Sequence, residues 1–293
     1  MRAYAANRWG TSDVELASEG MEYFLFRVST DKGPLAIKAA TALSISDDID
    51  DAIDTSLSLA REASVLKHLR SNGAKVPDCF GFSQNEGFPL CVMEFIIGDG
   101  TSATDFSLGQ ALRAVHDAGP WPIAGKSPAE LESDFKIKIL GCIRQWLHKL
   151  VLRRRLDSSL MDAVHPAVFD GYAMPRLTTL HMDLRRANVI AAKNGVAAIL
   201  DWGNAIIGDP WLDLLRVEEY SELEMGQFRS GYGDAPPRPP AAIEHLYRLY
   251  TTSMMSLLFE NMVPDPELCR LNTERTVGHL VALRTSSHQA PIK

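Results

Sequence analysis

A short segment of the sequence gathers side chains that could do chemistry. From Leu180 to Pro210 it runs LHMDLRRANVIAAKNGVAAILDWGNAIIGDP, with polar residues on both sides of two apolar stretches. The stretches NVIAA and VAAIL are predicted to be short strands joined at KNG, because Asn194-Gly195 is a typical hairpin turn pair. A hairpin brings its two open ends together, so Asn188 and Asp201 are expected to be neighbours.

Asp183 lies five residues before Asn188, on the loop that leads into the hairpin. Two carboxylates and an amide oxygen that converge make an oxygen-rich site, which suits Mg²⁺ together with water and phosphate oxygens. A carboxylate that does not bind the metal can orient or deprotonate a hydroxyl. A set of turn and capping residues is the alternative, but it requires three spacings to match by chance. His181 is interpreted as a packed, hydrogen-bonded residue of the same loop.

The pattern H-x-D-x-x-x-x-N, a hairpin and D-x-G resembles the catalytic and metal loops of protein kinases. The form in this chain has Trp after the second Asp and a trailing G-D-P-x-x-D, and is similar to the aminoglycoside phosphotransferase and choline kinase family. Ordered landmarks extend from Val14 to Leu215. The resemblance implies an α+β, bilobal protein-kinase-like fold, with a small N-terminal antiparallel sheet lobe carrying one helix and a larger, mostly helical C-terminal lobe.

The same resemblance implies a role for each polar residue of the two loops. Asp183 would accept or orient the proton of the substrate hydroxyl, and Arg185 would steady the moving phosphoryl group. Asn188 and Asp201 would hold Mg²⁺, and ATP or GTP would be the phosphoryl donor.

An independent feature of the N-terminal part fits this interpretation. Lys38 in PLAIKAA is a cation within an otherwise apolar predicted strand, which is costly unless the charge is paired. Glu62 lies on the helix predicted next, and the pair matches the family's Lys and Glu at the nucleotide phosphates. The alternative is that Glu62 is a solvated helix residue beside Arg61.

Two further segments resemble nucleotide-binding parts of kinases. VMEFIIG is similar to the linker that reads adenine, which would place Met93 at the back of the pocket and the Glu94 carbonyl and Ile96 N–H on the adenine edge. The turn ASEGM holds one glycine and departs from G-x-G-x-x-G, so Ser18 and the adjacent backbone would cover the phosphates.

No A-P-E segment follows DWG, which argues against a peptide substrate. The weak glycine loop leaves transfer of AMP open as a variant.

Periodicity predicts the elements that position these groups. Residues 13–40 indicate strands, the segment TSLSLAREASVLKHLRSNG indicates a helix, and VPDCFGFSQ and FPLCVMEFI indicate two more strands. Beyond residue 98 the pattern is helical, apart from the hairpin and a Pro-rich loop at 233–240. We therefore expect a nucleotide-binding lobe at 1–97 and a lobe at 98–293 that carries the catalytic loop, the metal loop and the substrate site.

Composition limits the partners. The chain has 293 residues, a net charge of -7 and a pI of about 5.6, which argues against a nucleic-acid protein with a broad basic surface. No apolar run is long enough for a membrane span or a signal peptide. Four scattered cysteines predict free thiols in a reducing compartment. We expect a cytoplasmic protein without a nucleic-acid or membrane partner.

The acidic run RVEEYSELE follows the metal loop and could meet a cationic substrate. Glu218, Glu219 and Glu222 are candidates for that contact, and Trp211 could line a sugar or nucleoside pocket. The alternatives are a solvated acidic face and a packed indole.

These features predict an ATP- and Mg²⁺-dependent O-phosphotransferase of a small-molecule hydroxyl. The acceptor is expected to be an antibiotic, either aminoglycoside-like or otherwise cationic or sugar-containing, in resistance or self-protection. A metabolic kinase of an amino alcohol, sugar or amino acid remains an alternative. A catalytically silent kinase-like binding protein is disfavoured, because Lys38, Asp183, Asn188 and Asp201 are all present.

Overall fold

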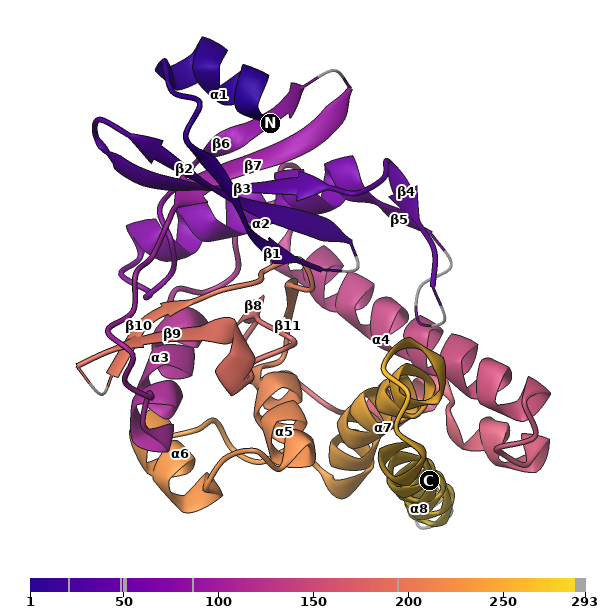
Figure 1. The fold of residues 1–293 in the computed structure, drawn as a ribbon. Helices are drawn as coiled ribbons and strands as arrows, with labels where there is room; N and C mark the ends of the chain where they lie inside the picture. Colours follow the sequence, from indigo (N-terminus) through magenta and orange to yellow (C-terminus); the bar gives the residue numbers. More distant parts are fainter. Residues whose placement is uncertain (21, 48, 50–51, 86, 194, 288–293) are drawn as a thin grey trace.

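The computed structural model describes residues 1–20, 22–47, 49, 52–85, 87–193 and 195–287 (Figure 1). The predicted turn residue Asn194 lies outside the described residues. An antiparallel sheet forms one end of the molecule and helices form the other, with short strand pairs between them. The α+β, bilobal, kinase-like architecture predicted from the sequence is confirmed.

The sheet has the strand order β1-β2-β3-β7-β6. Its strands are the ones predicted from alternation and turn residues: β1 (Val14–Glu19), β2 (Tyr23–Thr30), β3 (Gly33–Ala40), β6 (Cys79–Asn85) and β7 (Phe88–Glu94). Lys38 of β3 lies opposite Leu25 of β2 and Cys91 of β7, so it occupies the middle of the sheet. A further strand pair, β4 (Ser44–Ile45) with β5 (Ile53–Asp54), leads into the first long helix.

Helix α2 (Thr55–Ser71) packs against β6 and β7. Asp54 caps its start by accepting hydrogen bonds from two backbone N–H groups of the first turn. Leu59, Leu66 and Leu69 are fully or almost fully buried, and Glu62 lies on the same buried face with 2% of its surface exposed. The apolar face of α2 that packs against the sheet therefore also places the Glu62 carboxylate at the sheet.

The N-terminal lobe differs from the expectation of a single helix. Residues Arg2–Trp9 form α1, which covers part of the sheet. Ala5 of α1 belongs to a small core with Val28, Ile37 and Leu90, separate from the main core. The helix is short and weakly apolar, so its stability depends on this packing rather than on its own propensity.

The C-terminal part is built from six α-helices within the described residues, together with short 3₁₀ and π turns. They are α3 (Asp105–Asp117), α4 (Pro128–Leu152), α5 (Pro210–Tyr220), α6 (Met225–Tyr232), α7 (Ala241–Leu257) and α8 (Pro266–Ser287). None of these described helices combines the length and apolar character needed to cross a membrane.

Two strand pairs carry the polar loops. The predicted hairpin is present as β9 (Val189–Ala192) and β10 (Gly195–Ile199), paired antiparallel. Strand β8 (Thr178–Leu180) pairs with β11 (Ile206–Gly208). The loop from 181 to 188 therefore leaves β8 and enters β9, while the loop from 200 to 205 leaves β10 and enters β11.

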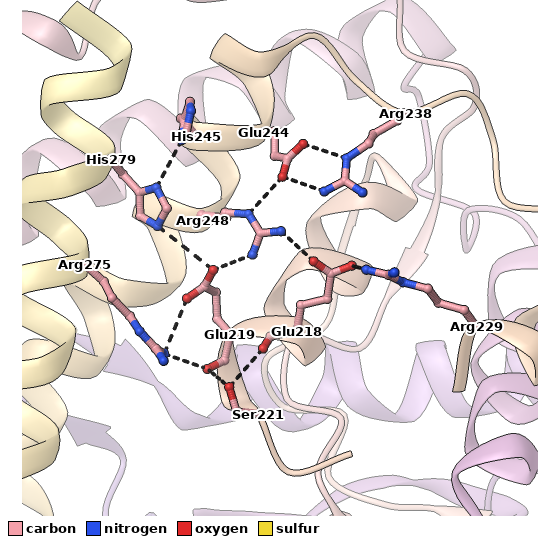
Figure 2. A network of polar contacts seen from close by, with 10 residues as sticks. All are labelled: Glu218, Glu219, Ser221, Arg229, Arg238, Glu244, His245, Arg248, Arg275 and His279. Carbon is pink, nitrogen blue, oxygen red and sulfur yellow. Dashed lines mark hydrogen bonds and ion pairs between the residues drawn. The ribbon is translucent and has the colours of Figure 1, made fainter. Parts of the chain in front are cut away.

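A network of charged side chains ties the end of α5 to α7 and α8 (Figure 2). Arg248 of α7 pairs with Glu218 and with Glu219 of α5, each at 2.5 Å between nitrogen and oxygen. Arg229 of α6 also pairs with Glu218, and Arg275 of α8 lies 3.6 Å from Glu219. Pairs that are largely removed from water and share partners fix geometry more firmly than isolated surface pairs.

Two histidines also belong to this network. His245 of α7 and His279 of α8 approach with their Nδ1 atoms 3.1 Å apart. Burial, with the nearby His245 and Arg248, lowers the pKa of His279 to about 4. His279 is therefore neutral in the folded chain at pH 6, whereas in the unfolded chain it binds a proton below about pH 6.5. Its contribution to stability is present above pH 6.5 and is lost as the pH falls towards 4.

We predict that His279→Gln flattens the acid dependence of stability. Between pH 7 and pH 5 the wild type should lose about 1–2 kcal/mol of unfolding free energy that the variant keeps, because glutamine takes up no proton. Urea unfolding at several pH values measures this, with the exposed His148→Gln as the matched control. Equal acid dependence in wild type and His279→Gln would contradict the assignment.

Candidate active site

Lys38 lies at the junction of three elements. Its Nζ donates to Glu62 of α2 at 2.9 and 3.2 Å and to Asp201 of the β10–β11 loop at 2.9 Å. Burial lowers the pKa of Lys38, but the attraction of both carboxylates outweighs burial and raises it above its usual value. The ring of Tyr23 on β2 lies 4.6 Å from the same nitrogen. The lysine is therefore charged at neutral pH and fixed in position.

The loop that carries Asp201 is fixed from the side of α2. Glu62 accepts a hydrogen bond from the Trp202 N–H at 3.3 Å, and Arg61 donates to the Gly203 carbonyl at 2.5 Å. Asp201 has φ of 62°, a conformation unfavourable for a residue with a side chain. The positive charge of Lys38 holds the pKa of Asp201 below its usual value. Half of its side chain is exposed, so the carboxylate can reach a ligand.

The loop that is predicted to be catalytic, residues 181–188, is fixed by a buried carboxylate of α5. Asp213 is 2% exposed and accepts hydrogen bonds from the N–H groups of His181 and Met182 at 2.7 and 2.8 Å. Met182 has φ of 67°, a second strained residue. The His181 ring contacts the Leu200 carbonyl at 2.8 Å and the Asp183 N–H at 3.1 Å. His181 thus connects the two loops and is fully buried.

Asp183 is oriented by three neighbours. Tyr220 of α5 donates to its Oδ1 at 2.8 Å, and Asn188 donates through Nδ2 to its Oδ2 at 2.8 Å. Arg185 lies with Nε 3.1 Å from Oδ1. The amide nitrogen of Asn188 also bonds the Asp183 carbonyl at 2.8 Å, so its amide oxygen is the atom left for a cation. A carboxylate held at both oxygens is suited to receive a hydroxyl in one orientation.

The residues predicted for the nucleotide come from β1, from β7 and from the segment that follows β7. Met93 on β7 is 7% exposed, and the Glu94 carboxylate accepts a hydrogen bond from the Asp78 N–H at 3.2 Å. The Ile96 N–H bonds no other described residue, which leaves it available to a ligand. Ser18 is exposed near the end of β1, next to the turn into β2. Their roles towards a nucleotide stay predictions.

Three of the four residues predicted for the substrate have other partners in the structure. Glu218 and Glu219 are neutralised by the arginines of α6, α7 and α8 (Figure 2). Trp211 is 7% exposed, and its indole donates to the Pro237 carbonyl of the Pro-rich loop at 2.9 Å. We therefore do not retain these three as substrate residues. Glu222 is exposed and accepts a long hydrogen bond from the Arg186 N–H at 3.4 Å, so it stays beside the catalytic loop.

Sequence reasoning missed the polar face of α5. Asp213, Arg216 and Tyr220 are spaced by three and four residues, so they share one face of the helix. Asp213 contacts the backbone of the catalytic loop, and Tyr220 contacts the side chain of Asp183. The signal was available for Asp213 and Arg216, because these two polar residues at helical spacing interrupt the otherwise apolar run PWLDLLRV.

Tyr23 in the N-terminal lobe was also missed. Tyr23 lies against Lys38, but in the sequence it is one of several aromatic residues on an alternating strand, and nothing local distinguishes it.

Comparison with known proteins places this geometry in a family. The profile of the phosphotransferase enzyme family (APH) matches residues 20–245. No protein with a curated description matches the chain.

Solved structures share the fold. A choline/ethanolamine kinase family protein from Mesorhizobium loti is 18% identical, with a TM-score of 0.60 over 97% of this chain and 98% of that one. A spectinomycin phosphotransferase in complex with ADP and spectinomycin is 14% identical, with a TM-score of 0.58 over 98% and 97%. A streptomycin–ATP ternary complex of APH(2")-IIa is 15% identical, with a TM-score of 0.60 over 94% of each chain. The chain belongs to the phosphotransferase enzyme family.

Proposed function

We propose that this phosphotransferase moves the terminal phosphoryl group of ATP, with Mg²⁺, to a hydroxyl of a small molecule. The observation that carries the proposal is the contact of Lys38 with both Glu62 and Asp201, close to an Asp183 whose two oxygens are oriented by neighbours. A silent binding protein would not need this assembly, and two strained residues are maintained to build it.

The chemistry of the donor set fits a magnesium nucleotide. Asp201 offers a half-exposed carboxylate, and Asn188 offers an amide oxygen. Among the described residues no cluster of three or more His, Cys, Asp or Glu forms a complete metal cage. Mg²⁺ commonly takes one or two protein oxygens and completes its coordination shell with water and phosphate oxygens, so two protein ligands are enough for it. Bound there, Mg²⁺ would neutralise phosphate charge during transfer.

Each residue then has a task in transfer. Lys38 binds phosphate oxygens and is kept in place by Glu62. Asp183 orients the acceptor hydroxyl and takes its proton as the new oxygen–phosphorus bond forms, while the bond from the terminal phosphorus to the bridging oxygen of ATP breaks and ADP leaves. Arg185 lies beside Asp183 and supplies positive charge where the phosphoryl group passes.

For the nucleotide, we propose that Ile96 N–H and the Glu94 carbonyl bond the base, with Met93 behind it and Ser18 above the phosphates. GTP remains an alternative donor. We propose residues 1–97 as the nucleotide-binding unit and 98–293 as the unit that carries the acceptor site, in a cytoplasmic protein without a nucleic-acid partner.

Two acceptor classes have support. Similar folds bind spectinomycin and streptomycin, which supports an antibiotic hydroxyl and a role in resistance. A metabolic acceptor is favoured by a specific observation: Glu218 and Glu219 are already paired with arginines and are not free to bind a polycation. We therefore propose the metabolic acceptor first and keep the antibiotic as the second candidate.

The proposal is tested by mass spectrometry of an acceptor panel incubated with Mg²⁺ and ATP or GTP. The panel holds aminoglycosides, other antibiotics, amino alcohols, sugars and hydroxy amino acids. One class should gain a phosphoryl group. Bound nucleotide with no phosphorylated product in any class would count against the proposal, and a product carrying AMP would replace it.

Asp183→Ala should lower turnover by about 100- to 10,000-fold while ATP affinity stays within a few-fold, because Asp183 acts on the hydroxyl and not on the nucleotide. Steady-state kinetics and calorimetry measure the two quantities. Turnover near the wild-type value would remove Asp183 from its proposed role.

Asp201→Ala should abolish the gain in ATP affinity that Mg²⁺ provides, because the half-exposed carboxylate is the proposed protein ligand of the metal. ATP titrations with and without Mg²⁺ measure this. Asp31→Ala, at an exposed turn, is the control and should behave as wild type. If Asp201→Ala keeps the full magnesium effect, the metal assignment is wrong.

Tyr220→Phe should lower kcat about tenfold with little change in KM for ATP, because Asp183 loses one hydrogen bond that orients it. Tyr247→Phe removes a similar buried hydroxyl that bonds Asp209, and it serves as the matched control. An equal loss of kcat in both variants would indicate general destabilisation and not a positioning role.

A further inference from the structure

Arg216 on α5 is a buried cation that the carboxylates of Asp183 and Asp213 attract without forming an ion pair with it. Only 7% of its surface is exposed, and its guanidinium makes no hydrogen bond or ion pair with any residue that the structure describes. Its Nε is fully buried and unpartnered. The two terminal nitrogens keep some exposed surface. An arginine cannot lose its proton in a protein, so the charge remains.

The other buried charged residues do have partners. Lys38 pairs with Glu62, Asp213 with His116 and backbone N–H groups, and Glu219 with Arg248. Asp209 accepts hydrogen bonds from two tyrosines. Arg216 is the exception among the buried Lys, Arg, Asp and Glu side chains of the described residues. Taking an ion out of water without such partners is costly, so the burial of Arg216 without an ion pair requires an explanation.

Two aromatic rings flank the guanidinium. Its central carbon lies 5.2 Å from the ring centre of Tyr220 and 6.0 Å from that of Tyr250 on α7. Such cation–π contacts return only part of the cost of burying a charge, and they leave the hydrogen-bond donors of the guanidinium unused. The rings therefore explain how Arg216 is held, but they leave its hydrogen-bond donors without an acceptor.

The position of Arg216 connects it to the proposed acceptor site. Tyr220 contacts Asp183 with its hydroxyl and Arg216 with its ring face. The guanidinium therefore lies within about one tyrosine side chain of the carboxylate that orients the acceptor hydroxyl. A small molecule whose hydroxyl meets Asp183 can present a second group to Arg216.

We propose that Arg216 binds an anionic group, a carboxylate or a phosphate, of the molecule that is phosphorylated. The fork of the guanidinium matches the paired oxygens of either group, and the flanking tyrosines keep it in one plane. This inference rests on the proposed function and narrows its acceptor: the substrate is a hydroxylated anion and not a polycation. The internal pairing of Glu218 and Glu219 agrees with this choice.

Matched acceptors test the proposal in the wild-type protein. Hydroxy acids, hydroxy amino acids and sugar acids are compared with their amides, and sugar phosphates with their parent sugars. Binding is measured by calorimetry in the presence of ADP and Mg²⁺, so that no transfer is required. At least one anion should bind about 10- to 100-fold more tightly than its neutral counterpart, and the class that does so identifies carboxylate or phosphate.

Variants then assign the preference to Arg216. Arg216→Met should abolish the difference between anion and neutral counterpart, and Arg216→Lys should keep part of it. Arg270→Met, at an exposed position of α8, should leave it unchanged. Thermal unfolding of each variant is followed in parallel. If Arg216→Met weakens both members of a pair equally, the residue is only structural.

The outcomes separate this inference from the proposed function. Anion binding that depends on Arg216 without phosphoryl transfer would keep the anion site and reject the phosphotransferase. Phosphoryl transfer to neutral or cationic acceptors, with anions bound no better, would keep the phosphotransferase and overturn the anion site. Absence of binding by every anion of the panel would also overturn it.

Discussion

The structure depends on the need to neutralise one lysine. Lys38 sits in the middle of a sheet, and the two carboxylates that compensate it come from α2 and from the loop after β10. The charge is satisfied only when the sheet, the helix and the loop meet at one point. The same contact that relieves the cost of burial therefore assembles the proposed nucleotide side of the site and connects the sheet to the loops after β8 and β10.

The proposed acceptor side is organised by α5. One face of this helix fixes the backbone of the catalytic loop through Asp213 and the side chain of Asp183 through Tyr220. Its far end is tied to α7 and α8 by the arginine–glutamate network (Figure 2). Glu218 and Glu219, which were predicted to contact a substrate, thus connect helices to one another. Arg216 has no ion pair and lies next to Tyr220, which contacts Asp183. Because the acidic residues are paired within the protein and Arg216 is not, we expect an acceptor with negative charge in place of a cationic one.

Much of the fold and of the two functional loops could be predicted because their signals are local. The hairpin followed from a turn pair between two apolar stretches, and α2 followed from leucines at helical spacing. Lys38 was conspicuous as a charge in an apolar strand. The contact of Lys38 with Asp201 spans 163 positions, and here only the resemblance to kinase loops brought the two segments into one site.

The residues whose contacts sequence reasoning did not foresee depend on distant partners. Glu218 and Glu219 look like a solvated or ligand-binding acidic run until Arg248 and Arg275 are brought beside them by α7 and α8. Trp211 is covered by a loop that follows it by more than twenty residues. Arg216 is visible in the sequence as a charge within an apolar run, but its lack of an ion-pair partner is not, because an unpaired and a paired arginine are written alike.

The most direct measurement of the central claim is a crystal structure of this chain with Mg²⁺ and a non-hydrolysable ATP analogue. The account predicts phosphate oxygens at Lys38, the metal between Asp201 and Asn188, and the terminal phosphate facing Asp183. A nucleotide bound elsewhere, or bound there with Asp183 turned away from its terminal phosphate, would contradict it.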